Sequence, residues 1–134
     1  LEEFSSLWKT TLKTMTPECA SALTYSGGLD SSIILSHIDN LELYTTNMTG
    51  KDPIVNHIED FLTSKEMSRL NQLHIGPELW AEYFLEILER TKMPVQSWSF
   101  VGQWAIAEAC KERVLFTGVC AWTVMTTTKD KQHY

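Results

Sequence analysis

Residues 26–32 read Ser-Gly-Gly-Leu-Asp-Ser-Ser, and this run decides how the rest of the chain is interpreted. The preceding residues, 21–25, are mostly apolar or β-favouring and predict a strand. The mostly apolar residues 33–38 predict the first turns of a buried helix. Adjacent glycines at 27 and 28 let the backbone bend sharply, so the chain is expected to pass from strand through a glycine turn into a helix.

A turn of this kind is suited to binding an anion. Without a Cβ at Gly27 or Gly28, an anion can approach the backbone closely, and the free N–H groups of a helix start attract it. Hydroxyl donors are added by Ser26, Ser31 and Ser32. Asp30 would repel a bare phosphate, so its presence indicates a Mg²⁺ ion shared between its carboxylate and the phosphate oxygens.

The same residue types also occur in hairpins and capped helices, which is the alternative interpretation. Five specified residue types in six positions arise by chance with odds on the order of one in a million per start site, which favours phosphate binding. Two other phosphate motifs, G-x-x-x-x-G-K-[ST] and G-x-G-x-x-G, do not occur in the sequence.

The run at 26–32 resembles the PP-loop, or SGGxDS motif, of the ATP pyrophosphatase superfamily. That superfamily includes asparagine, argininosuccinate, GMP and NAD synthetases and tRNA-thiolating enzymes. The resemblance implies an adenine nucleotide α-hydrolase-like (HUP) fold, an α/β architecture whose parallel sheet carries helices on both faces. It also implies ATP and Mg²⁺ as cofactors, with ATP split between its α- and β-phosphates.

Within the superfamily, two stretches look most like asparagine synthetase: residues 25–34, and Val-Leu-Phe-Thr-Gly at 114–118. In that family the second stretch reads V-L-x-[ST]-G-E-G-[AS]-D-E. Its first glycine contacts adenine, and its acids serve substrate, metal and pyrophosphate chemistry. Thr117, Gly118 and Ala121 match this pattern. The departures are Val119, Trp122 and Thr123 in place of acids, and Cys120 in place of the second glycine.

The resemblance assigns a role to each matching residue. The β- and γ-phosphates are expected to bind Ser26, Gly27, Gly28, Ser31 and Ser32. Asp30 is expected to be the catalytic residue and the Mg²⁺ ligand, and the backbone near Thr24, Thr45 and Gly118 is expected to frame adenine. A small carboxylate substrate would attack the α-phosphate to give an acyl-adenylate, which an amine would then open.

The departures leave two functions open. Val119 and Trp122 can neither bind Mg²⁺ nor accept a proton. Compared with the family, the domain is expected to be truncated, without the helical half of the synthetase domain and without a glutaminase domain. One possibility is an AMP-forming amide ligase that completes its site from a partner chain or a second copy. The other is a degenerate PP-loop domain that binds nucleotide without catalysis or serves in assembly.

Composition narrows the class of protein. We expect a single domain over residues 1–134, and the net charge of −6 disfavours a nucleic-acid partner. Cys19, Cys110 and Cys120 lack metal-binding spacing, which is typical of reduced thiols in a cytoplasmic protein. No apolar run approaches the roughly 20 residues that span a bilayer, so no membrane association is expected.

The hydrophobic pattern elsewhere predicts helices over 1–15, 54–65, 78–90 and 97–111. Strands are predicted at 41–46, 69–75 and 114–116, and this alternation favours a parallel sheet. Ligands bind such sheets beyond the carboxyl ends of the strands, where the strand order reverses.

Each predicted helix has an apolar stripe that we expect to be buried. The first stripe consists of Phe4, Leu7, Trp8, Leu12 and Met15; the second of Ile54, Ile58, Phe61 and Leu62; the third of Leu79, Trp80, Tyr83, Phe84, Ile87 and Leu88. In the third helix Glu82, Glu86 and Glu89 are expected to face solvent, and in the fourth Trp98 and Trp104 are expected in the core.

Overall fold

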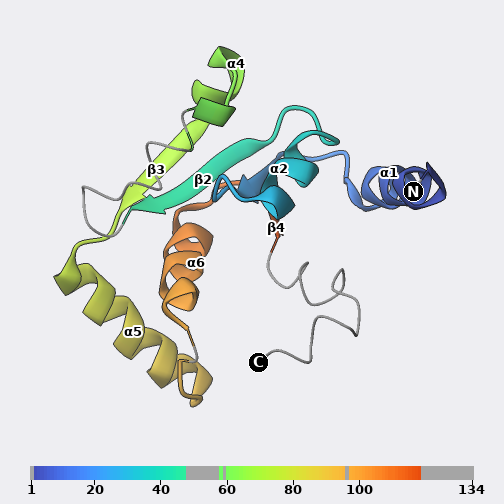
Figure 1. The fold of residues 1–134 in the computed structure, drawn as a ribbon. Helices are drawn as coiled ribbons and strands as arrows, with labels where there is room; N and C mark the ends of the chain where they lie inside the picture. The colour runs from blue at the N-terminus through green and yellow to red at the C-terminus, as the bar shows by residue number, and fades with distance from the viewer. Residues whose placement is uncertain (1, 48–57, 59, 96, 119–134) are drawn as a thin grey trace, which may run out of the picture.

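The computed structural model describes residues 2–47, 58, 60–95 and 97–118 of the chain. Its centre is one sheet of four strands, all parallel, in the order β3-β2-β1-β4 (Figure 1). The strands are β1 (Ser21–Thr24), β2 (Glu42–Asn47), β3 (Leu70–His74) and β4 (Val114–Thr117). The prediction of an α/β fold with a parallel sheet is confirmed, and each strand lies within two residues of its predicted bounds.

The strand order reverses next to β1. From β1 the chain moves outward to β2 and β3, and it then returns across the sheet to place β4 on the free side of β1. In the resulting register Leu23 lies between Leu43 and Phe116, and Thr24 is paired with Thr117. The carboxyl ends of β1 and β4 therefore meet at the position where parallel sheets bind ligands.

Two helices cover one face of the sheet. α1 (Glu2–Met15) precedes β1, and α2 (Leu29–Leu35) connects β1 to β2 (Figure 1). Because side chains alternate along a strand, Leu23 and Leu43 point to this face together. They form one core with buried residues from the helices and loops: Leu12, Tyr25, Ile34, Ile38, Leu41 and Ile58.

The opposite face is covered by α6 (Trp98–Ala109), on which α5 (Pro77–Thr91) packs. Ala22, Tyr44 and Ile106 form the buried cluster between α6 and the sheet. Gly102 allows the helix to lie close to β2, because a Cβ at that position would be 3.0 Å from Oγ1 of Thr46. Helices thus lie on both faces of the sheet, as expected.

The predicted helix at 54–65 is wrong in its second half. Residues 58, 60 and 61 are helical, but the helix stops there, and the short α4 (Ser64–Met67) starts afresh. Thr63 caps α4 in a capping box: its hydroxyl accepts a bond from the Glu66 N–H, and the Glu66 carboxylate accepts one from the Thr63 N–H. Phe61, predicted to be buried, is 67% exposed.

The apolar stripes are buried only in part. In α1, Leu12 is buried and Trp8 is half-buried, whereas Leu7 and Met15 are about two-thirds exposed. In α5, Ile87 is buried and Leu79 is exposed, because α5 packs mainly on α6 and only part of its apolar stripe reaches that helix. Ile54 and the side chains of Phe4 and Trp98 lie outside the described part.

Among the described residues, no helix is both long and apolar enough to cross a bilayer.

Candidate functional site

The glycine turn lies at the carboxyl end of β1 and leads directly into α2, as predicted. Gly27 has φ of +72°, a conformation that strains any residue with a side chain, and a Cβ there would be 3.1 Å from Cγ1 of buried Ile58. Gly28 is the extended N-cap residue of α2, so the helix begins four residues earlier than its apolar run indicated. The turn therefore requires glycine at position 27, whereas the backbone conformation of Gly28 is open to any residue.

The serine hydroxyls bond within the turn. Ser31 is buried, and its Oγ donates a 3.0 Å hydrogen bond to the carbonyl oxygen of Gly28. Ser26 Oγ accepts a 3.3 Å bond from the Gly28 N–H and lies 3.4 Å from Ser31 Oγ. Ser32 Oγ lies 3.4 Å from the Tyr25 hydroxyl. Ser31 thus braces the turn, whereas Ser26 is exposed above it.

The long contacts of Ser26 indicate which groups an anion could reach. Distances of 3.3–3.4 Å exceed the usual 2.7–3.2 Å range of N–H···O bonds, so they are weak. An anionic oxygen could replace Ser26 Oγ as the acceptor of the hydrogen bond from the Gly28 N–H. The freed Ser26 hydroxyl could then donate a hydrogen bond to the same anion. Exposed Gly28 and Ser26 are therefore the most accessible of the predicted phosphate-binding residues.

The two predicted motifs meet at this edge of the sheet. Gly118, the residue after β4, lies against the first turn of α2. A Cβ on Gly118 would be 2.9 Å from Cβ of Asp30 and 3.2 Å from the backbone nitrogen of Ser31. Residues almost ninety positions apart thus come into contact, and only a glycine fits there without displacing backbone.

The two threonines assigned to adenine are not brought together. Thr24 pairs with Tyr44, so it shares the α6 face of the sheet, whereas Thr45 points to the face covered by α2. Thr45 is buried and Thr24 is half-buried. Only the backbone at the ends of their strands can face a common ligand.

Asp30 is the one charged side chain among the predicted site residues. Within the described ranges, no group of three or more His, Cys, Asp or Glu side chains could hold a metal ion. A Mg²⁺ ion that arrives with a nucleotide commonly takes one or two carboxylates and completes its shell with phosphate oxygens and water. Asp30 fits that requirement, and the departures at Val119, Cys120, Trp122 and Thr123 lie outside the described residues.

A second polar cluster lies at the opposite end of β4, and no sequence pattern predicted it. The carboxylate of Glu112, two residues before β4, accepts a 3.0 Å bond from the Tyr44 hydroxyl and lies 3.4 Å from the Cys110 thiol. Partial burial raises the pKa of Glu112, but bonds from backbone N–H groups, Tyr44 and Cys110 outweigh this and lower its pKa overall. The pKa of Tyr44 is raised, first by burial and second by its hydrogen bond to Glu112. The cluster ties β2 to the start of β4.

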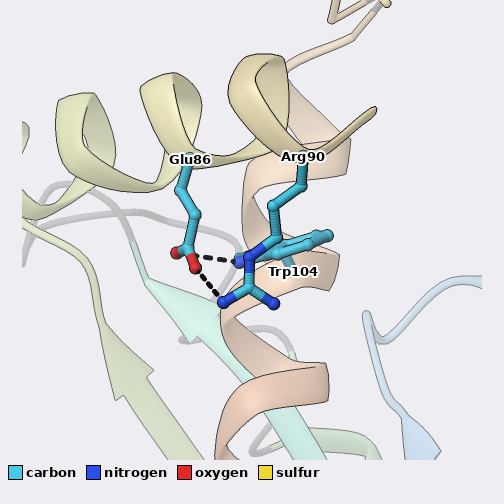
Figure 2. Close-up of polar contacts among 3 residues, drawn as sticks. All are labelled: Glu86, Arg90 and Trp104. Carbon is cyan, nitrogen blue, oxygen red and sulfur yellow. Dashed lines mark hydrogen bonds and ion pairs between the residues drawn. The ribbon is translucent and has the colours of Figure 1, made fainter. Parts of the chain in front are cut away.

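A third cluster joins α5 to α6. Glu86 forms a 2.6 Å ion pair with Arg90 and accepts a 3.3 Å bond from Nε1 of Trp104 (Figure 2). The Arg90 guanidinium lies 5.4 Å from the centre of the Trp104 ring. Glu86 was predicted to face solvent and Trp104 to lie in the core. Both predictions are wrong, because the two residues meet at a half-buried helix–helix contact.

Comparisons of the chain with protein-family models, with curated proteins and with solved structures gave no match.

Proposed function

We propose that the chain is an adenine nucleotide α-hydrolase-like domain that binds ATP with Mg²⁺ at the carboxyl ends of β1 and β4. The observation that carries this proposal is the contact of Gly118 with Asp30 and Ser31, which joins both segments of the asparagine synthetase resemblance. This junction coincides with the reversal of strand order, where parallel sheets bind ligands.

Each residue has a role in the proposed complex. The Gly28 N–H and the Ser26 hydroxyl bind phosphate oxygens in place of their present contact with each other. Gly27 supplies the left-handed bend, Ser31 holds the bend from beneath, and Ser32 extends the row of hydroxyls. Asp30 binds the Mg²⁺ that accompanies the nucleotide, and the backbone of Gly118 faces the adenosine.

The proposed reaction is adenylation of a small carboxylate. A substrate carboxylate oxygen attacks the α-phosphorus of ATP, the bond to the bridging oxygen breaks, and pyrophosphate leaves with that electron pair. An amine then attacks the acyl carbon, AMP leaves, and the amine loses a proton to give the amide. Asp30 would hold the Mg²⁺, whose positive charge would stabilise the negative charge of the departing pyrophosphate.

A second candidate is a domain that binds nucleotide without catalysis. It is favoured by the sparse charge at the site, since the described residues form no group of three or more His, Cys, Asp or Glu side chains beside Asp30 that could hold a metal ion. Loss of preorganised charge costs several kcal/mol in a transition state but much less in ground-state binding. A domain of this kind could therefore retain ATP binding after it has lost turnover.

The test measures ATP binding by calorimetry and pyrophosphate release with Mg²⁺, with and without aspartate and ammonia. Asp30→Asn should abolish release and weaken Mg·ATP binding at nearly unchanged melting temperature. Asp39→Asn, an exposed acid beyond α2, is the matched control and should change neither. Binding without release supports the second candidate. Absence of binding by the unaltered chain would refute both.

A further inference from the structure

A cleft between α1 and the end of α2 has a lining that fits an anion. Its volume is about 320 Å³, and it is lined by Ser6, Lys9, Thr10, Lys13, Ser36 and His37. The lining contains two lysines, a histidine and three hydroxyls but no carboxylate. This is a local excess of positive charge in a chain whose net charge is −6. We refer to it as the lysine cleft.

The residues of α1 reach the cleft because of their spacing. Positions 6, 9, 10 and 13 recur every three or four residues, so they lie along one side of the helix. α1 is held in place from its other side by Leu12, which is buried in the same core as Ile34 and Ile38. The wall formed by α1 is therefore fixed relative to α2.

Lys9 and Lys13 are four residues apart on this wall. Like charges at this spacing repel, at a cost of about 0.2–0.5 kcal/mol in a helix. An anion between the two ammonium groups would replace repulsion with two attractions. The arrangement is thus more favourable with an anion bound than without one.

Two carbonyl groups at the end of α2, which would repel an anion, already accept hydrogen bonds from nearby groups. The Ile33 carbonyl oxygen accepts a 2.8 Å bond from Ser36 Oγ, and Nδ1 of His37 lies 2.8 Å from both of these atoms. The Ile34 carbonyl oxygen accepts the N–H groups of His37 and Ile38. These contacts engage Nδ1 of His37, so a ligand in the cleft would meet the other ring nitrogen, Nε2.

We propose that the lysine cleft binds a phosphate monoester. Lysine is a compact point charge, and two of them with hydroxyl neighbours suit a tetrahedral dianion better than a planar carboxylate. The cavity is larger than a phosphate group, which leaves room for the organic part of the ligand. This site is distinct from the glycine turn, since the cleft involves the opposite end of α2.

The test is an NMR titration of the chain with glycerol phosphate at constant ionic strength. Saturable shifts of the Ser36 and His37 amides are expected. Lys9→Gln/Lys13→Gln should weaken binding about tenfold, because two exposed charge pairs are lost. Lys65→Gln/Lys111→Gln removes the same charge elsewhere on the surface and should leave affinity unchanged.

Three results would overturn the proposal: no saturable shift together with no vesicle binding that depends on Lys9 and Lys13, an equal loss in both double variants, or shifts confined to residues 26–28. The last would assign phosphate binding to the glycine turn alone. A parallel sedimentation experiment with phosphatidic acid vesicles distinguishes a soluble ester from a lipid headgroup of the same chemistry. Loss of vesicle binding in the Lys9/Lys13 variant without any response to glycerol phosphate would assign the cleft to the headgroup.

Discussion

Gly118 touches Asp30 across the junction of β4 and α2, with room for a hydrogen atom but not for a methyl group. We predict that Gly118→Ala costs about 1–3 kcal/mol of unfolding free energy, because the added carbon meets backbone atoms that cannot rotate away. Denaturant unfolding measures this cost. Gly76→Ser is the control, since nothing lies within 4 Å of a Cβ at Gly76 and serine is a favoured N-cap residue. Equal losses in both variants would contradict the close packing at Gly118.

The two glycines of the turn should respond differently to substitution. Gly27→Ala is expected to cost about 1–2 kcal/mol, because alanine is strained in the left-handed conformation. Crowding against Ile58 adds to this cost. Gly28→Ala should cost less, since its φ of −77° suits any residue and the nearest atom is Oγ of Ser26, at 3.3 Å. Thermal unfolding of the two variants gives the comparison, and a reversed order would disprove the assigned geometry.

The contact between α5 and α6 provides a prediction on helix docking. Trp104→Phe keeps the ring beneath Arg90 but removes the N–H that bonds to Glu86, so a loss of about 1 kcal/mol is expected. Arg90→Ala should cost less than about 1 kcal/mol, because the arginine side chain is 61% exposed. A double-mutant cycle between Glu86 and Trp104 measures the coupling directly. A coupling energy of zero would show that their bond contributes nothing.

Stability should depend on pH through Glu112. Its pKa is lower in the folded chain than the ordinary value of 4.5, so its contribution is fully present above that value. The contribution is lost as the pH falls through the folded pKa, because protonation weakens the bonds from Tyr44 and the backbone. Glu112→Gln should flatten this part of the acid unfolding curve. An unchanged curve would mean that other carboxylates account for the acid sensitivity.

The sequence was sufficient for the elements whose local pattern agrees with their packing. Helices α1, α5 and α6 and all four strands lie within two residues of their predicted bounds. The glycine turn was equally predictable, because its conformation depends on residue types at adjacent positions.

Features that depend on distant residues were not predictable. Glu86 looked solvent-facing because its own helix gives no sign of the indole that α6 brings to it. The bond between Tyr44 and Glu112 joins residues 68 positions apart, and neither belongs to a motif. Phe61 fits the apolar stripe of a helix that continues to residue 65. The capping box at Thr63 starts a new helix instead, so that stripe does not form and Phe61 is exposed.

The position of β4 beside β1 has a consequence for synthesis of the chain. β1 is synthesised before β4 and keeps one edge unpaired until β4 emerges from the ribosome, since Ser21 pairs with Val114. Contacts this distant in sequence slow folding and leave a hydrogen-bonding edge open to other chains in the meantime. A nascent chain halted before residue 114 is therefore expected to depend on chaperones, and the junction of β1 and β4 becomes available to ligand only when synthesis of β4 is complete.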